Sequence, residues 1–449
     1  MFKKFTNGCV RVVNRWLPDP FLFAIILTII VFFGAMASTR QGPIELISAW
    51  GSNSGFWQLL SFSMQMVLIL VFGSAMASAK ACKRALASIA SLAHNKMSAI
   101  MIVTFVSAIC CYFSWGFGLV TSALLAKEIA RRVSDVDYPL LVASAYSGFV
   151  IWHAGLSGSI PLQLGSETGT SILGIVYSVP VSETIFHPVN LAMCFSIIIT
   201  MPMINYAMHP NRDETVLAVP ALLEEEKEKN YTIETPAEKI EHSRILWVAV
   251  LVFGFVYIVN YFSTKGFSLE LNIVNMILLF LGILLHGDLR RYVDAIGSAA
   301  SGSSGILLQF PFYAGIMGLM VSQNAEGVSL AGTIASFFVN ISNEVTFPVF
   351  TFLSAGIINF FVPSGGGQWA VQAPFAMPAA NEIGLDYGCV AMAIAWGDQW
   401  TNMIQPFWFL PILGITGLPA KNIMGYLVVV TLYVGIVACL GFTVWAALY

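Results

Sequence analysis

A single carboxylate, Asp398, stands inside a long apolar run that covers residues 387–412. It lies about eleven residues into the run, which corresponds to the middle of a membrane span of ~20 residues. A charged carboxylate without a partner is costly at that depth, so a residue of this kind is a functional candidate by default. Asp398 could carry a coupling proton, or it could bind a cation together with Thr401, Asn402 and backbone carbonyls. The alternative is a structural hydrogen bond to a break in the helix.

His153 is the corresponding candidate in the first half of the chain, at a position close to that of Asn402. It could carry a proton, although an isolated histidine in an apolar run is more often a structural residue. Ser157 and Ser159 follow and could donate to a ligand, although serines also bond to helix carbonyls. Residues 155–159 fall short of the G-x-S-x-G motif of serine hydrolases, because residue 159 is serine and the strand–turn–helix context is missing. An intramembrane enzyme is therefore the less favoured alternative.

Two glycine-containing turns, at 115–118 and 364–367, interrupt apolar stretches in the two halves. No Lys or Arg is expected deep in a span, so a carboxylate substrate would have no buried cation to bind. The free N–H groups of a helix N-terminus can bind an anion instead, and glycine lets the backbone approach it closely. The alternative is that these glycines only allow tight turns or close helix packing. The residues predicted to bind substrate are Ser114, Gly116, Gly118, Thr121, Ser157, Ser364, Gly365, Gly366, Gly367 and Gln368.

The composition predicts which elements position these residues. Of the 449 residues 57% are hydrophobic and 10% are charged, against about 25% charged in soluble domains. Several apolar runs reach the ~20 residues that cross ~30 Å of hydrocarbon. We therefore expect an all-α polytopic membrane protein, with the lipid bilayer as its solvent. The predicted spans are residues 18–38, 57–79, 138–164, 186–208, 245–263, 271–286, 303–322, 387–412 and 423–447.

Two further apolar stretches, 98–133 and 346–382, are too long for one helix and too short for two full spans. We predict that they are re-entrant hairpins, which enter and leave the membrane on the same side and have the glycine turns at their tips. With the N-terminus in the cytoplasm, all 21 Lys and Arg residues except Arg40 and Lys265 then lie on the cytoplasmic side. The C-terminus is expected outside. The first apolar run is too long for a signal peptide and is expected to be retained.

The two halves resemble each other at a nearly constant offset. Residues 104–108 match 351–355, the two glycine turns match, and the Asp-Tyr pair at 137–138 matches the pair at 386–387. We predict two inverted repeats, which in secondary transporters place the substrate at their interface. Segments 83–94 and 328–340 are predicted to lie along the membrane as interfacial arms. The predicted parts are an N-terminal repeat at 1–208 with a hairpin open to the cytoplasm, a cytoplasmic linker with one connecting span at 209–270, and a C-terminal repeat at 271–449 with a hairpin open to the outside.

Several aromatic and glycine-rich segments together form a specific pattern. They are 15–20 (RWLPDP), 115–120 (WGFGLV), 137–141 (DYPLL), 309–316 (QFPFYAGI), 362–367 (VPSGGG), and 399–400 (QW) with Asn402 and 405–408 (QPFW). With these segments the chain resembles the bacterial short-chain fatty acid transporter family over nearly its whole length. The resemblance implies uptake of short-chain fatty acids such as butyrate or acetoacetate across the cytoplasmic membrane. It also implies kinship with ion-coupled transporters that have two hairpins and an elevator-like movement.

We expect a secondary active transporter of a small monocarboxylate, coupled to a cation that is either a proton or sodium. The residues expected to handle this ion are His153, Asp398, Thr401 and Asn402. No P-loop motif occurs, which argues against a primary pump, and no basic patch indicates nucleic acid. The pattern of cysteine and histidine residues indicates no metal site, and no cofactor is expected. The expected location is the inner membrane of a bacterium, and the state could be a monomer or a homodimer.

Two alternatives remain at this stage. A dicarboxylate or another organic anion could be carried on the same scaffold, and a channel would share the same composition. The rings of Trp115, Phe117, Trp369 and Trp396 would suit a short acyl tail better than a second charge, provided that they face the site.

Overall fold

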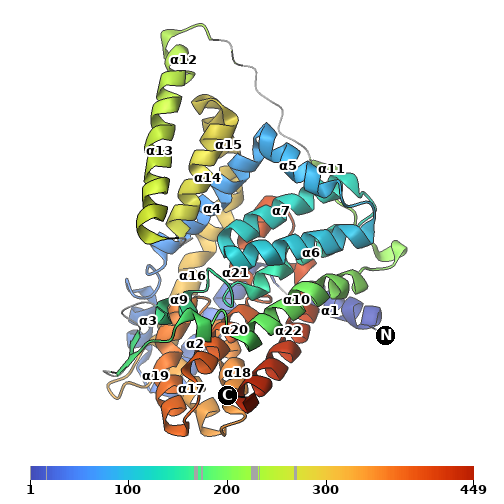
Figure 1. Ribbon diagram of the computed structural model, residues 1–449. Coiled ribbons are helices and arrows are strands. Elements are labelled where there is room, and N and C mark those ends of the chain that lie inside the picture. Colours follow the sequence, from blue (N-terminus) through green and yellow to red (C-terminus); the bar gives the residue numbers. More distant parts are fainter. Residues whose placement is uncertain are drawn as a thin grey trace.

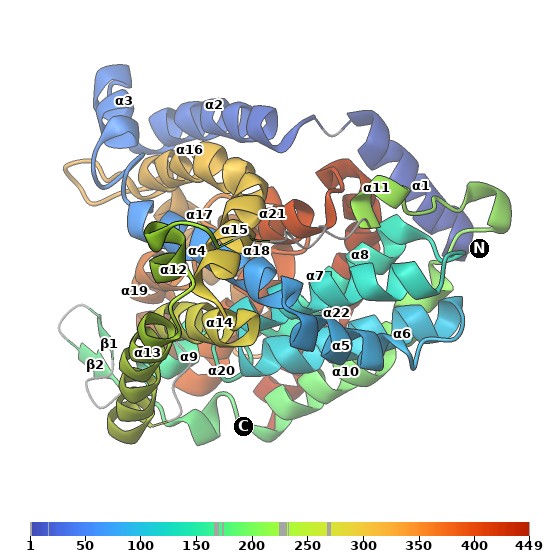
Figure 2. The same ribbon diagram turned by 90° about the horizontal axis from the view of Figure 1, so that it is seen from above.

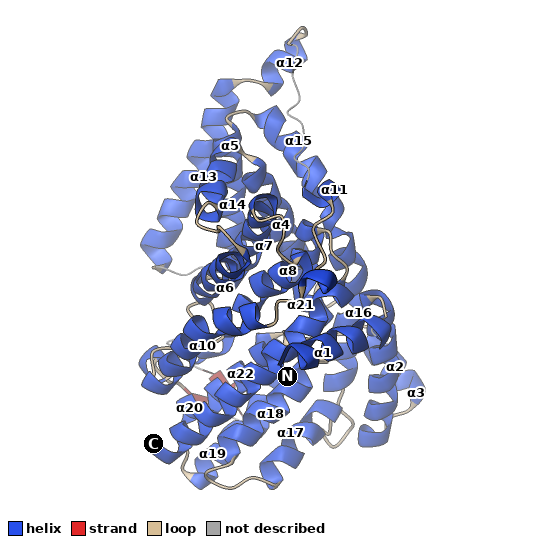
Figure 3. Cartoon of the chain, turned by 90° about the vertical axis from the view of Figure 1, so that its right-hand side faces the viewer, coloured by secondary structure: helices blue, strands red, loops and turns tan. Residues whose placement is uncertain are grey.

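The computed structural model describes residues 2–16, 18–165, 170–172, 175–223, 231, 233–266 and 271–448. Most of these residues lie in helices (Figure 1, Figure 3). The described strands are β1 (Thr170–Ile172) and β2 (Ile175–Tyr177), which pair antiparallel at the margin of the helical body (Figure 2). These two three-residue strands are a small addition to a chain that is otherwise mostly helical where it is described.

Polar residues and prolines set the starts of several helices. Asp19 and Asp137 each accept a hydrogen bond from the first turn of the helix that they precede, and a proline stands in the first turn of both helices. The helices of the first half are α1 (Phe2–Trp16), α2 (Pro20–Thr39), α3 (Pro43–Gly51), α4 (Leu60–Ser78), α5 (Lys80–Ala90), α6 (Lys96–Phe113), α7 (Trp115–Arg132), α8 (Tyr138–Ser147), η1 (Gly148–Ile151), α9 (Ser159–Leu164), η2 (Val181–Glu183) and α10 (Pro188–Ala207).

The linker and the second half are also helical. Helices α12 to α15 lie together at one end of the body (Figure 1), and α13, α14 and α15 share a small apolar core with Ala75 of α4. The helices are η3 (Arg212–Glu214), α11 (Pro220–Leu223), α12 (Pro236–Glu241), α13 (Arg244–Lys265), α14 (Leu271–His286), α15 (Leu289–Ala300), η4 (Ser301–Ser303), α16 (Ser304–Val321), α17 (Leu330–Asn340), α18 (Phe347–Asn359), α19 (Gly365–Ile383), α20 (Tyr387–Thr401), α21 (Pro406–Thr416) and α22 (Ala420–Leu448).

Among the described residues, seven helical segments are long and apolar enough to cross a membrane. They are Pro20–Thr39, Leu60–Ser78, Lys96–Phe113, Pro188–Ala207, Pro236–Lys265, Leu289–Val321 and Ala420–Leu448. Six of them coincide with predicted spans. The remaining one is α6, the first arm of the stretch predicted as a hairpin. The predicted span at 271–286 is α14, whose 16 residues extend about 24 Å at 1.5 Å per residue.

The predicted spans 138–164 and 387–412 are each interrupted, as their sequences indicate. The first changes from α8 to η1 and then to irregular turns before α9 begins at Ser159. The second ends its first helix, α20, at Thr401, and a new helix begins at Pro406. Proline explains the second break, because it lacks an N–H and favours the first turn of a helix. Both breaks leave backbone and polar side chains to be satisfied by neighbouring elements.

Helices at matching positions of the two halves make matching contacts. Helix α6 packs on α8 and α10, and α18 packs on α20 and α22 in the same way. Helix α7 packs on α5 and α8, and α19 packs on α17 and α20. Helices α2 and α4 contact the other half, where their partners are α16 and α14 respectively. These contacts join the first and second halves of the chain.

The residues that directly precede α7 and α19 have the same backbone conformation. Ser114 separates α6 from α7 with φ −155° and ψ 114°, and Ser364 precedes α19 with φ −152° and ψ 113°. At Ser114 one extended residue separates two helices, whereas α18 ends at Asn359 and residues 360–364 precede α19. The sequence predicted an interruption in each stretch, but the glycines expected in non-helical tips lie in the first turns of α7 and α19.

Helix α22 links the starts of α8 and α20. The Tyr426 hydroxyl donates to Asp137, which caps α8, at 3.2 Å, and the Trp445 indole N–H donates to Asp386, which caps α20, also at 3.2 Å. Tyr426 and Trp445 are separated by about 28 Å along one continuous helix, at 1.5 Å per residue. The two caps therefore lie about one hydrocarbon thickness apart.

Candidate substrate and ion site

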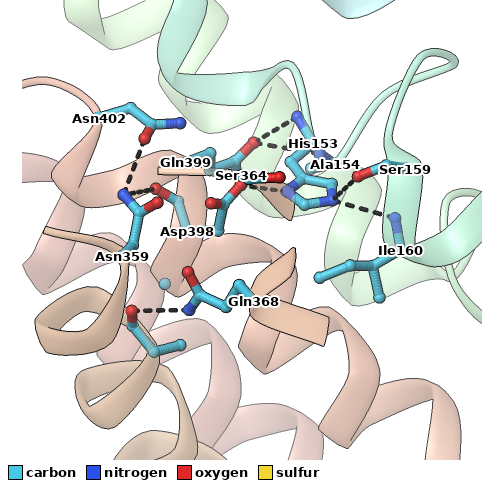
Figure 4. Close-up of polar contacts among 12 residues, drawn as sticks. His153, Ala154, Ser159, Ile160, Asn359, Ser364, Gln368, Asp398, Gln399 and Asn402 are labelled. Carbon is cyan, nitrogen blue, oxygen red and sulfur yellow. Dashed lines mark hydrogen bonds and ion pairs between the residues drawn. The ribbon is translucent and has the colours of Figure 1, made fainter. Parts of the chain in front are cut away.

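The interruption after α8 meets helix α20 at a buried histidine–aspartate pair (Figure 4). His153 Nδ1 lies 2.6 Å from Asp398 Oδ2, and both side chains are fully buried. The two residues are 245 positions apart in the chain, so the contact joins the two halves. Asp398 is about 17 Å along α20 from its start, again at 1.5 Å per residue, which is near mid-depth for a span of ~30 Å.

The surroundings of His153 fix its tautomer. The backbone N–H of Ile160 donates to Nε2 at 3.1 Å, and Ser159 Oγ lies 3.0 Å from the same nitrogen. Because a backbone N–H can only donate, Nε2 must be the acceptor and carries no proton. The ring proton is then on Nδ1 and points at the Asp398 carboxylate.

Amide side chains hold the two breaks in place. Gln399 Oε1 accepts the backbone N–H groups of His153 at 2.8 Å and Ala154 at 3.1 Å. Asn359 Nδ2 donates to the carbonyl of Asp398 at 2.7 Å and to Asn402 Oδ1 at 2.7 Å. These bonds satisfy backbone groups that a continuous helix would have paired with each other.

Three buried side-chain oxygens near the pair have no hydrogen-bond partner in the part of the chain that the structure describes. They are Asp398 Oδ1, Asn359 Oδ1 and Gln368 Oε1. The amides of Asn359 and Gln368 are not free to rotate, because their nitrogens donate to the carbonyls of Asp398 and Ala355. Figure 4 shows the three oxygens on the same side of the pair, where α18, α19 and α20 pack together. A group of acceptors without a donor favours a cation or a proton.

Both tips contact the turn that contains His153. The Ser157 hydroxyl oxygen accepts the backbone N–H of Trp115 at 3.1 Å. Gly365 lies directly against the other side, because a Cβ at this glycine would be 2.6 Å from His153 Cε1. The turn 152–159 therefore lies between the tip at Ser114 and the tip at Ser364.

The predicted substrate residues differ in what they contact. The hydroxyl of Ser364 caps its own helix by accepting the N–H of Gly367 at 3.3 Å.

The glycines of the first tip are packed closely. A Cβ at Gly116 would meet Ile69, and one at Gly118 would lie 2.7 Å from the Cys111 backbone nitrogen, which favours the alternative of close helix packing for these two glycines. Ser114 is buried and Thr121 is half-buried, and no side-chain hydrogen bond of either is seen among the described residues. Gly366 faces open space.

The predicted ion residues lie together, with different roles. His153 and Asp398 form the pair itself. The Thr401 hydroxyl donates to the carbonyl of Gly356 at 2.8 Å, and Asn402 Oδ1 accepts from Asn359. The oxygens of Thr401 and Asn402 are thus engaged in internal bonds, whereas those of Asn359 and Gln368 are unpaired.

Sequence reasoning missed Asn359 and the holding role of Gln399. Asn359 was visible as a polar residue near the end of the apolar stretch 346–362, beside the predicted tip. Gln399 adjoins Asp398, but only the fold shows that its oxygen reaches across to His153. No Lys or Arg side chain is buried anywhere in the described residues, and they contain no group of three His, Cys, Asp or Glu side chains that could hold a metal.

A family model and two bacterial relatives match nearly the whole chain. The model of the family described as "Short chain fatty acid transporter" matches residues 1–445. A protein of Escherichia coli (strain K12), named as a candidate short-chain fatty acid transporter, is 44% identical over 448 residues, which are 99% of this chain and 100% of that protein. A Haemophilus influenzae protein of the same name is 42% identical over 436 residues, which are 95% of this chain and 96% of that protein.

Among solved structures, the Alcanivorax borkumensis YdaH transporter covers 96% of this chain and 98% of its own, with 15% identity and a TM-score of 0.41. A likeness of that size supports no conclusion about fold or activity. The match to the family model and to the two bacterial relatives is different, because it extends over almost every residue of a multi-pass, apolar helical protein. On these grounds the chain belongs to the short-chain fatty acid transporter family.

Proposed function

We propose that the protein is a secondary active transporter that moves short-chain monocarboxylates, such as butyrate and acetoacetate, across the cytoplasmic membrane of a bacterium in symport with a cation. The observation that carries this proposal is the buried pair of His153 and Asp398, which joins two broken helices and has both tips beside it. A titratable pair at mid-depth between two halves is suited to couple ion binding to a change of access.

The inverted arrangement of the repeats is part of the proposal. Asp137 and Asp386 cap equivalent helices, and α22 holds them about 28 Å apart along its axis. If α22 crosses the bilayer, α8 and α20 start on opposite faces, as inverted repeats require. The matched contacts of α5 to α10 and α17 to α22 support the same assignment. The stretches 98–133 and 346–382 are then re-entrant hairpins, and α5 and α17 are the arms that carry them.

The coupling ion is proposed to bind at Asp398. Its free Oδ1 and the free oxygens of Asn359 and Gln368 form an all-acceptor group in a region without a buried Lys or Arg among the described residues. Oxygen ligands of this kind suit a hard cation such as sodium. A proton on Asp398 would satisfy only one of the three oxygens, so sodium is the first ion to test and a proton the second.

The substrate class follows from the family and from the charge of the core. A carboxylate cannot form a buried ion pair with Lys or Arg here, because the described core contains neither. It must be held by N–H groups, either of the helix N-termini at the tips or of side chains. A dicarboxylate remains the alternative substrate on the same scaffold, and it would need two such sets of donors.

Uptake of labelled butyrate into proteoliposomes tests the proposal. Purified wild-type protein should concentrate butyrate when an inward sodium gradient is imposed, or an inward proton gradient if the ion is a proton. Asp398→Asn should abolish the gradient dependence, whereas Asp213→Asn, in the exposed η3, should behave as wild type. Folded protein that moves no monocarboxylate above empty liposomes would overturn the assignment, and dicarboxylates would then be tested on the same preparation.

A further inference from the structure

Five buried nitrogen donors have no acceptor within the described part of the chain; four lie at the break between α20 and α21, and the fifth, on Trp152, lies in the turn that packs against it. They are the amide nitrogens of Gln399, Asn402 and Gln405 and the indole nitrogens of Trp152 and Trp408. A buried donor without an acceptor is unfavourable, and native structures contain few of them. Five in one region therefore require an explanation.

Misassigned amide orientations do not explain the three amides. Gln399 Oε1 accepts two backbone N–H groups, and Gln405 Oε1 accepts the N–H of Phe407 at 2.8 Å. Asn402 Oδ1 accepts from Asn359, whose own nitrogen is fixed by the carbonyl of Asp398. Exchanging O and N in any of the three amides would place two donors against each other. Each NH₂ group must therefore point away from the N–H that its own amide oxygen accepts.

The two indole groups belong to an aromatic cluster. The rings of Trp152 and Trp408 are 5.8 Å apart, and Trp408 is 5.3 Å from Trp115 and 5.4 Å from Phe149. Trp152 also stacks on His153, with 4.2 Å between centroids, which joins the cluster to the ion pair. Apolar ring faces and unpaired N–H groups thus occur together, as they do in sites that bind small amphipathic ligands.

We propose that these five N–H groups, together with the rings of Trp115 and Phe149, form the substrate site. The inference rests on the transporter function proposed above and names the atoms that bind its substrate. The three amides carry two N–H bonds each and the two indoles carry one each, so eight N–H bonds are present. A carboxylate has two oxygens with about four lone-pair positions and can accept up to about four of these bonds, while the acyl tail packs on the rings. All five nitrogens are shielded from solvent, so substrate reaches them when the tips or the broken helices move apart.

This placement also separates the substrate from the coupling ion. The unpaired donors lie at the α20–α21 break and on the aromatic cluster, whereas the unpaired acceptors lie on α18, α19 and Asp398. An anion at the donors and a cation at the acceptors would stabilise each other across the His153–Asp398 pair. The apolar ring faces of the cluster suit an acyl tail better than a second charged carboxylate, which predicts a preference for monocarboxylates over dicarboxylates.

Tryptophan-to-phenylalanine variants test the site, because they remove one N–H and keep an aromatic ring. Trp408→Phe and Trp152→Phe should each raise the KM for butyrate uptake about tenfold, the expected effect of losing one hydrogen bond to a charged group. Trp396→Phe is the matched control, because the indole N–H of this fully buried residue already donates to Asn190 at 2.8 Å. It should lower the melting temperature and leave KM unchanged.

A direct binding measurement on detergent-solubilised protein separates folding from affinity. Calorimetry should show weaker butyrate binding for both site variants, and butyramide, which lacks the carboxylate, should not compete with butyrate on the wild type. The inference is overturned if the wild type transports butyrate and both site variants keep its KM, or if Trp396→Phe raises KM as much as they do. A wild type that neither binds nor moves any monocarboxylate would count against the proposed transporter function itself.

Discussion

His153 Nδ1 and Asp398 Oδ2 lie 2.6 Å apart, and the opposite nitrogen of the same ring accepts the N–H of Ile160. The ring is therefore a neutral donor to the carboxylate, and in this arrangement it has no free position for a second proton. The site that can still gain a proton or a cation is Asp398 Oδ1. The histidine thus orients the carboxylate, and under the proposed symport Asp398 is the residue whose charge we expect to change.

Removing the histidine should destabilise the protein through the unpaired carboxylate that remains. We expect His153→Phe to lose about 3–5 kcal/mol of stability, the usual effect of breaking a buried pair by removing one partner. The double variant His153→Phe/Asp398→Leu should recover most of that loss, because it removes the buried charge, yet it should show no coupled uptake. Thermal unfolding in detergent measures the first effect and proteoliposome uptake the second. If the stability changes of His153→Phe and Asp398→Leu, measured singly, add up to that of the double variant, the two side chains are not coupled.

Neighbouring glycines at the second tip offer a matched pair of variants. A Cβ at Gly365 would lie 2.6 Å from His153 Cε1, whereas one at Gly366 would meet nothing within 4 Å. Both glycines are in the first turn of α19, so alanine gives each a similar gain in helix propensity. Gly365→Ala should lower butyrate uptake at least about tenfold, which corresponds to 1.4 kcal/mol, and Gly366→Ala should not. Equal activity of both variants would show that the tip does not need to close on His153.

A surface pair near the linker should give a pH-dependent contribution to stability. Burial alone would raise the pKa of Asp288, but hydrogen bonds from His242 at 2.6 Å and from the backbone N–H of Arg291 outweigh it and hold the pKa below its ordinary value. A carboxyl with a lowered pKa stabilises the fold above its unfolded pKa of about 3.9, and this contribution is lost as the pH falls through the folded pKa. The melting temperature of Asp288→Asn should lie below that of the wild type at neutral pH.

The difference between Asp288→Asn and the wild type should shrink as the pH is lowered to about 3, where the native carboxyl becomes protonated. Asparagine caps helices about as well as aspartate, so the loss of the α15 cap does not confound the comparison. A difference that stays constant from neutral pH to about pH 3 would mean that the charge of Asp288 does not contribute.

The sequence predicted the elements better than their contacts. Apolar runs and glycine or proline positions located most of the spans and both interruptions, because helix length and backbone freedom are local properties. Asp398 was identified as a candidate from its depth alone. Its partner was named only as a separate candidate, since the two residues are 245 positions apart and meet only through the packing of two broken helices.

Side-chain directions could not be read from the sequence. Of the four aromatic residues expected near a site, Trp115 belongs to the cluster and Trp369 is buried outside it. Phe117 is 40% exposed, and the N–H of Trp396 is already bonded to Asn190. Which ring faces the centre depends on the rotation of each helix, and this is set by contacts with helices from the other half. The unpaired donors at the α20–α21 break could not be predicted for the same reason. A donor can be recognised as unpaired only when the positions of all neighbouring acceptors are known.

The orientation of the two halves can be tested with single cysteines in a background that lacks the seven native ones. Asp135 lies in the exposed turn before α8, and Glu382 lies at the exposed end of α19 before α20. Because α22 holds the caps of α8 and α20 about 28 Å apart along its axis, these turns should lie on opposite faces of the membrane. A membrane-impermeant maleimide on intact cells should label Glu382→Cys and leave Asp135→Cys unlabelled until the membrane is opened. Labelling of both cysteines from the outside would contradict the proposed inverted arrangement and the assignment of both re-entrant hairpins.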